Sequence, residues 1–311
     1  MNIQQFQYVL AVAETRHFET AASKCFITQS TLSTMISKLE EEINIKLFDR
    51  KKKPVELTKE GKLIVEHFKT IIKDIQQLEE LTSEIKGELK GNLSISVIPT
   101  IAPFLLPRFL QDFAIQFPNL KIVVREEPTK EIIRQLKSRE LDIGIVSTPI
   151  NDEDLIETHL YDEPFVYYNA QKTTSKYSKI ENLNTENLCL LEEDHCMRTQ
   201  VIKLCEIKNL NFANKLNFDY KAGSIDSLIR FVKANKAATL LPYLSSLDLS
   251  SADKKHISEF SKPIPYRSVG IITHRHFVKK KLLGNLGTEI QSKIKKIIVP
   301  KTKYGERLDP L

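Results

Sequence analysis

The sequence predicts an α/β protein in two parts, a small helical N-terminal part with a short hairpin and a larger C-terminal part in which strands and helices alternate. Two observations predict this division. Apolar residues recur at helical spacing through about the first 85 residues. From residue 92 onward, short runs rich in valine and isoleucine alternate with amphipathic stretches. The 311 residues are enough for two domains with separate cores.

The composition is that of an ordinary globular protein, with 41% hydrophobic and 28% charged residues. No apolar run approaches the ~18 residues that span a membrane, and the N-terminus lacks the pattern of a secretory signal. We therefore expect a cytoplasmic protein with no membrane partner. Four cysteines are too few for a disulfide-framed fold, and a bridge in a reducing compartment is expected to be transient or redox-sensing.

The first sixty residues predict three helices followed by a hairpin. Residues 3–14 are amphipathic, residues 18–24 contain the small pair Ala21–Ala22, and Thr28 is a suitable N-cap for a helix over residues 29–42. Hydroxyl and amide side chains on an exposed helix suit the reading of base edges in a DNA groove. The outer face of this third helix carries Gln29, Ser30, Thr31, Ser33, Thr34 and Lys38.

A basic turn follows the third helix. Leu47-Phe48 is a short strand, the basic run with Pro54 is a turn, and residues 55–57 return as a second strand. The run itself is Arg50, Lys51, Lys52 and Lys53. The pattern is typical of a winged helix-turn-helix whose wing contacts phosphates. The alternative is a small helical subdomain with a solvated Ser/Thr face, and the pattern alone does not decide between them.

A long helix is expected next, because apolar residues recur at steps of four and three until Gly87 and Gly91 end the pattern. This heptad seam predicts pairing of two chains, although a helix packed on its own domain shows the same pattern. The seam consists of Ile64, Phe68, Ile71, Ile75, Leu78 and Ile85, with Thr82 as its one polar member.

The C-terminal part alternates strands and helices, which predicts an open, mostly parallel sheet. Two crossings between its halves indicate a hinge and a cleft, the layout of periplasmic-type binding proteins. Thr100 and Thr129 each lie where a strand passes to a helix, a place suited to a polar ligand, although Thr100 is equally explained as an N-cap before Pro103.

A cysteine segment lies in the second half of this part. Cys196 stands between His195 and Arg198, where cationic neighbours and a helix start favour the thiolate. If the residues from Cys196 to Cys205 were helical, their Cα atoms would lie roughly 13 Å apart. A disulfide needs about 4.4 to 6.8 Å, so a bridge requires the helix to unwind.

From spacing alone, such cysteines are mostly coincidental packing residues, and Cys25 and Cys189 are interpreted in that way. His274 and His276 lack a third ligand nearby, so no metal and no cofactor is predicted.

The N-terminal residues closely resemble the DNA-binding domain of LysR-type transcriptional regulators. The resemblance lies in Ala21-Ala22, residues 28–33, Leu39-Glu40, residues 47–50 and residues 57–61. It implies that Gln29, Ser30, Thr31, Ser33 and Thr34 face bases in double-stranded DNA, and that Arg50 and the neighbouring lysines contact phosphates. It also implies a homo-oligomer, a dimer of dimers paired through the long helix, and RNA polymerase as a partner.

The C-terminal part is similar to the peroxide-sensing branch of that family, through residues 97–107, 127–129, 190–200 with Cys205, 224–228, 239–242 and 267–270. The resemblance implies that hydrogen peroxide oxidises Cys196, that Cys205 resolves the product as a disulfide, and that a thioredoxin or glutaredoxin system reduces it. The implied supporting residues are Thr100, Thr129, His195, Arg198 and Arg267. Asp194 departs from the glycine that this branch prefers.

The expected domains are a winged helix-turn-helix over residues 1–60, a linker helix over 61–90 and an effector domain over 91–311. Its first lobe covers about 91–163 and 268–300, and its second about 164–267. The alternative function is a regulator of the same fold that binds a small metabolite, with incidental cysteines. A thiol peroxidase would leave the DNA-binding part without a purpose, so we do not expect an enzyme.

Overall fold

The computed structural model describes residues 1–86, 90–171, 177–183, 187–192, 196–205, 221–298 and 305–310. The chain forms two compact units, Met1–Lys86 and Gly87–Leu311. Each unit has a hydrophobic core of its own, as expected for independent domains. Among the described helices, none combines the length and the hydropathy that crossing a lipid bilayer requires.

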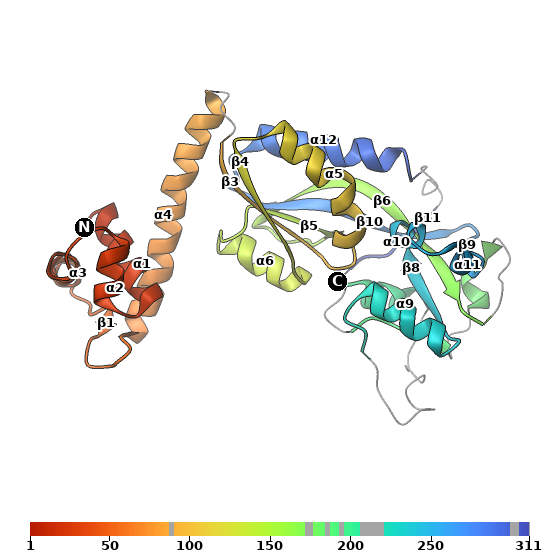
Figure 1. The fold of residues 1–311 in the computed structure, drawn as a ribbon, viewed down its shortest axis with the longest axis horizontal. Coiled ribbons are helices and arrows are strands. Elements are labelled where there is room, and N and C mark those ends of the chain that lie inside the picture. Colours follow the sequence, from red (N-terminus) through yellow and green to blue (C-terminus); the bar gives the residue numbers. More distant parts are fainter. Residues whose placement is uncertain are drawn as a thin grey trace. The chain divides into compact units, whose positions relative to one another are not determined.

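Three helices open the N-terminal unit: α1 (Ile3–Thr15), α2 (Phe18–Lys24) and α3 (Gln29–Ile43) (Figure 1). Thr28 accepts a hydrogen bond from the Thr31 amide at 3.2 Å, so the predicted N-cap of α3 is confirmed. Leu32, Ile36 and Leu39 are fully buried on the inner face of α3, which packs against α1 and α2. The polar start of α3 is therefore turned away from the core.

The wing is a hairpin of β1 (Phe48–Asp49) and β2 (Glu56–Leu57), paired antiparallel with Phe48 opposite Leu57. A buried carboxylate ties it to α3, because Glu40 accepts from the amides of Leu47 at 2.8 Å and of Phe48 at 3.3 Å. This arrangement confirms the predicted winged helix-turn-helix.

The long helix α4 (Lys59–Ile85) begins at Thr58, which accepts from the Gly61 amide at 2.8 Å. The predicted seam is divided along this helix. Phe68 is buried and stacks on Phe6 of α1, with ring centroids 4.2 Å apart, so this part of the seam closes the unit's own core. Farther along, Leu78 is 63% and Ile85 75% exposed. That part leaves apolar surface open.

The C-terminal unit alternates strands and helices as expected. Its first half contains β3 (Gly91–Val97), α5 (Ala102–Gln116), β4 (Leu120–Glu126), α6 (Thr129–Lys137), β5 (Ile143–Thr148) and β6 (Leu155–Asn169). Then follow β7 (Tyr177–Ser178), the 3-10 helix η1 (Ile180–Asn182), α7 (Cys196–Leu204), α9 (Ile225–Ala234), β8 (Ala238–Pro242), α10 (Tyr243–Leu247), α11 (Ser251–Lys254) and β9 (Ile257–Phe260). The chain ends with β10 (Ile264–His274), α12 (Lys280–Lys295) and β11 (Gly305–Arg307).

The sheet is mixed, so the prediction of a mostly parallel sheet is wrong. The strand order is β4-β3-β5-β10-β6-β9-β7, with β8 paired to β6 and β11 to β10. β3 runs parallel to β4 and β5, whereas β10 is antiparallel to both β5 and β6. The physical reason is that β6 and β10 are long strands in opposite directions, and hydrophobic spacing predicts strands without their direction.

The two long strands join the halves of the sheet and create the predicted two-lobed arrangement. β6 pairs with β10 from Leu155 to Pro164 and then with β8 from Phe165 to Asn169 (Figure 1). β6 therefore changes its partner strand near residue 164, and side chains at this point lie between the two halves of the sheet.

Candidate functional site

The two cysteines that the sequence singles out lie at opposite ends of α7. Cys196 is the first residue of this helix and is buried, whereas Cys205 follows its last residue and is half-buried. The Cys205 amide donates to the Val201 carbonyl at 3.0 Å, so the helical bonding extends to the second cysteine. Both thiols are free. At roughly 13 Å of helical rise they cannot bridge while α7 is intact.

Polar groups from three elements act on the Cys196 sulfur. The Thr129 hydroxyl at the start of α6 hydrogen-bonds to it, the backbone amides at the start of α7 point toward it, and the Arg267 guanidinium acts on it by its charge. The resemblance implies that Thr129 and Arg267 support Cys196, and in the structure both act on this thiol.

Burial nevertheless raises the pKa of the Cys196 thiol above its usual value, and the Arg267 charge and the Thr129 hydrogen bond offset this only in part. The helix start favours the thiolate as expected, but burial outweighs it, so the expected net shift toward the thiolate is not found. The reason is that the sequence does not reveal how completely the sulfur is removed from water.

Arg267 is the centre of the polar cluster and is only 1% exposed. Its Nη1 donates to the Thr100 hydroxyl at 2.9 Å and its Nη2 to the Thr100 carbonyl at 3.0 Å. On its other side, Nε and Nη2 donate to Glu163 at 2.9 and 2.7 Å. The guanidinium thus joins the loop before α5 to the crossing point of β6.

Sequence reasoning missed Glu163. Its side chain is 1% exposed and also accepts from the Leu244 amide at 2.8 Å. A charged residue directly before the apolar run Pro164-Phe165-Val166 is a signal of a buried ion pair, since a carboxylate in such a strand needs a partner. The identity of that partner depends on the register of β6 and β10, which the sequence does not show.

Arg198 is bound to the backbone of the segment before α7. Its Nη1 donates to the Leu191 carbonyl at 3.0 Å, so it connects α7 to the strand-like segment before it. Among the described residues, Arg267 is a cation whose charge lowers the pKa of Cys196, whereas Arg198 is bound to a backbone carbonyl. His195 and Asp194 lie outside the described residues.

The remaining cysteines differ in their surroundings. Burial raises the pKa of Cys205 to about 11 and that of Cys189 to about 12. Cys189 is 6% exposed within the core, so its interpretation as a packing residue is confirmed. Cys25 is half-buried at the end of α2 and packs against the core of the N-terminal unit.

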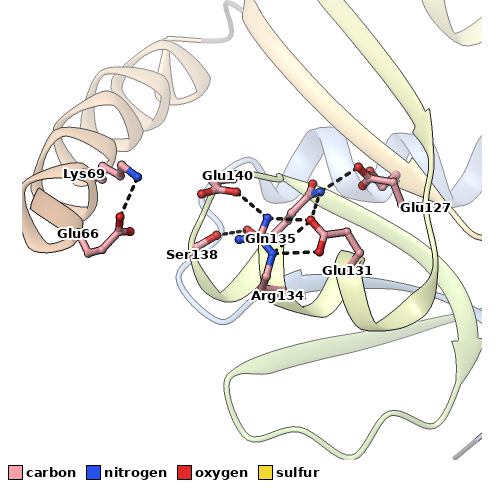
Figure 2. Close-up of polar contacts among 9 residues, drawn as sticks. Glu66, Lys69, Glu127, Glu131, Arg134, Gln135, Ser138 and Glu140 are labelled. Atoms are coloured by element: carbon pink, nitrogen blue, oxygen red, sulfur yellow. Dashed lines mark hydrogen bonds and ion pairs between the residues drawn. The ribbon is translucent and has the colours of Figure 1, made fainter. Parts of the chain in front are cut away.

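A second polar network holds the start of α6, where Thr129 lies. Glu127 accepts from the Ser96 hydroxyl at 2.7 Å and from Gln135 Nε2 at 2.9 Å. Figure 2 shows Gln135 between Glu127 and Glu131, and Arg134 paired with Glu131. Hydrogen bonds from Arg134 and Gln135 lower the pKa of Glu131 to about 2. The network ties α6 to β3 and so fixes the segment that presents Thr129.

The candidate DNA-reading surface is the start of α3 with the wing. The side chains of Gln29, Ser30, Thr31, Thr34 and Lys38 are exposed, whereas Ser33 is half-buried. The Arg50 side chain is bound to α3: its guanidinium donates to the hydroxyls of Ser33 and Ser37, each at 3.0 Å. Lys51, Lys52 and Lys53 are exposed, and Lys52 pairs with Glu56 at 2.5 Å.

Comparisons with known proteins agree with this division. Residues 3–62 match the model of the bacterial regulatory helix-turn-helix protein, lysR family, and residues 86–288 match that of the LysR substrate binding domain. The chain is 32% identical over 275 residues to the hydrogen peroxide-inducible genes activator of Pectobacterium carotovorum subsp. carotovorum, covering 88% of this chain and 90% of that protein. It is also 32% identical to the DNA-binding transcriptional dual regulator OxyR of Escherichia coli strain K12, covering 88% and 89%.

Among solved structures, a full-length OxyR variant from Pseudomonas aeruginosa superposes with a TM-score of 0.72 at 28% identity, covering 94% of this chain and 98% of that one. A second, an OxyR mutant from Porphyromonas gingivalis, has a TM-score of 0.62 at 28% identity and covers 70% of this chain and all of that one.

Proposed function

The chain belongs to the LysR family of bacterial transcriptional regulators, and from this membership we propose that it binds DNA and senses hydrogen peroxide through a reversible Cys196–Cys205 disulfide. The observation that carries the proposal is the set of polar groups that act on Cys196. A buried thiol receives a hydrogen bond from Thr129 and faces Arg267, which is itself bound to Thr100. A packing cysteine needs none of these groups. The relatives named hydrogen peroxide-inducible genes activator favour this over the response to a metabolite.

The oxidation takes place in two steps. The Cys196 thiolate attacks one oxygen of the peroxide, so that an S–O bond forms, the O–O bond breaks and hydroxide departs to become water. Thr100 and Thr129 orient the peroxide by hydrogen bonding, and the Arg267 charge stabilises the thiolate and the departing hydroxide. Arg198 supports the site indirectly, because its hydrogen bond to the Leu191 carbonyl ties α7 to the segment before it, and His195 supports it as the residue that precedes Cys196.

The sulfenic acid then reacts with Cys205. The Cys205 sulfur attacks Cys196, an S–S bond forms and water leaves, so that one peroxide removes two electrons from the two thiols. Because the intact helix keeps the cysteines apart, α7 must unwind for this step. A thioredoxin or glutaredoxin system supplies the two electrons that restore the thiols.

The DNA-binding arm uses the exposed start of α3 and the wing. Side chains that read base edges are Gln29, Ser30, Thr31, Ser33, Thr34 and Lys38, and phosphate contacts come from Arg50, Lys51, Lys52 and Lys53. The exposed apolar residues of α4 pair two copies of the chain, and two pairs form a tetramer that contacts RNA polymerase in the cytoplasm. Residues 1–60, 61–90 and 91–311 serve as DNA-binding, linker and effector parts.

Non-reducing peptide mapping after brief peroxide exposure tests the proposal. We expect a Cys196–Cys205 link that disappears in Cys196→Ser and in Cys205→Ser and that reductant converts back to thiols. A Cys196 that stays a free thiol while the protein still binds DNA would overturn the sensing function and leave the family membership intact.

A further inference from the structure

The C-terminal segment of the chain is bound beside the redox site. β11 pairs parallel with β10, with Pro265 opposite Glu306 and Tyr266 opposite Arg307. The Leu308 amide then donates to the Tyr266 carbonyl at 2.8 Å, next to Arg267 in the sequence. Leu308 is 5% exposed, which shows that its side chain belongs to the core. This segment is therefore a docked strand of the effector unit.

The same segment contacts α7 directly. Gln200 lies one helical turn after Cys196 and is fully buried. Its Nε2 donates to the Leu308 carbonyl at 2.6 Å and to the Ser147 hydroxyl of β5 at 3.1 Å. Among the described residues its Oε1 has no hydrogen-bond partner. The buried side chain of Gln200 is thus fixed by its amide group, between β5 and the C-terminal segment.

We infer that residues 305–310 hold α7, and with it Cys196, in the dithiol arrangement, so that release of this segment accompanies disulfide formation. The inference rests on the proposed function, because it concerns the same two cysteines. Its physical basis is that the bridge requires α7 to unwind, and unwinding α7 moves Gln200 away from the Leu308 carbonyl.

The hydrogen bond between Gln200 and the Leu308 carbonyl then influences the equilibrium between the two thiols and the disulfide. An interaction present only in the dithiol form stabilises that form against oxidation. Loss of one buried hydrogen bond and of the Leu308 packing should shift the equilibrium about tenfold toward the disulfide, which is ~30 mV for a two-electron couple. In the exchange, two glutathione molecules supply the electrons that break the protein disulfide, and they become one glutathione disulfide.

Two full-length readouts test the inference. The first is the equilibrium of the Cys196–Cys205 pair in glutathione buffers, measured by mass spectrometry of alkylated peptides. The second is the rate at which iodoacetamide alkylates Cys196 in the reduced protein without peroxide. The test variants are Leu308→Ser and a chain that ends at residue 304. The matched control is Arg307→Ser, because Arg307 is exposed on the same strand and forms a surface ion pair with Asp309 at 2.9 Å.

We expect both test variants to shift the equilibrium about tenfold toward the disulfide and to raise the alkylation rate of Cys196, while Arg307→Ser behaves as the native chain. If the shortened chain does not fold, Leu308→Ser decides. The inference is overturned if folded Leu308→Ser matches the native chain in both readouts, or if alkylation rises without a shift in the equilibrium. Should the native chain form no bridge at all, the proposed function fails, and the alkylation rates alone still show whether the segment holds Cys196.

Discussion

Arg267 and Glu163 lie directly opposite each other on the antiparallel strands β10 and β6, and their side chains form an ion pair of 2.7 Å in which each side chain is 1% exposed. The pair stands where the chain crosses between the lobes. Arg267 also donates a hydrogen bond to Thr100, and its charge acts on Cys196. The ion pair that links β10 to β6 therefore also positions the cation that acts on the Cys196 thiol.

Removing one partner of this pair should be strongly destabilising. Glu163→Ala leaves the Arg267 charge buried without compensation, and we expect the effector unit to lose about 3 to 5 kcal/mol of unfolding free energy, measured by urea denaturation. Arg275→Ala, which breaks an exposed pair with Asp154 in the same unit, is the control and should change little. Equal losses in the two variants would contradict the assignment of Glu163 as a buried structural partner.

The Thr129 hydroxyl should lower the pKa of Cys196 measurably. Thr129→Val removes its hydrogen bond to the sulfur at nearly constant volume, so we expect a higher pKa for Cys196 and about tenfold slower alkylation at neutral pH. The measurement is the pH profile of Cys196 alkylation. Thr129→Ser keeps the hydroxyl and should retain the native profile; a loss of rate there equal to that of valine would show that packing, not hydrogen bonding, matters.

The effector unit should lose stability in alkaline solution. The pKa of Cys205 is raised to about 11 and that of Cys189 to about 12, from an ordinary 9.0, because burial disfavours the thiolates. A group whose pKa is raised on folding contributes stability in full below its unfolded pKa, and this contribution is lost as the pH rises through the folded pKa. Urea denaturation in reductant should therefore show unfolding free energy falling from about pH 9 to pH 12. Cys189→Ala should flatten this decline, and an unchanged slope would argue against its burial.

Those parts of the fold and of the site that depend on neighbouring residues in the chain could be predicted from the sequence. Thr28 as a cap and the helix after it follow from rules of spacing. Local pattern marks Cys196, Thr100 and Thr129 as candidates, and a family resemblance gives their roles and adds Arg267. Glu163 and the contact between Gln200 and Leu308 could not be predicted, because they depend on strand register between distant residues. The pKa of Cys196 is predicted to be lowered but is raised. The reason is related, because a sequence shows the charges near a residue but does not show its burial.

The C-terminal part of α4, with its exposed apolar side chains, should mediate the association of two copies of the chain. Leu78 and Ile85 are 63% and 75% exposed, so Leu78→Glu with Ile85→Glu should dissociate the oligomer and leave the N-terminal core folded. Sedimentation equilibrium with circular dichroism measures both properties. Glu79→Gln, at an exposed neighbouring position, is the control. If the double variant keeps the native mass in solution, then pairing through this stretch of α4 is excluded.

The wing and α3 should contribute to DNA binding in different ways. Lys51→Ala removes a phosphate contact, so affinity should fall equally for all sequences and the salt slope should decrease by about one. Lys51 is a better probe than Arg50, which Ser33 and Ser37 hold, because replacing Arg50 also disturbs α3. Gln29→Ala should instead keep the slope and lose about 1 to 3 kcal/mol of discrimination at one base pair. Affinities measured over a range of salt, on an operator and on its single-base variants, separate the two effects. The same change in slope for both variants would mean that the start of α3 contacts the backbone and does not read bases.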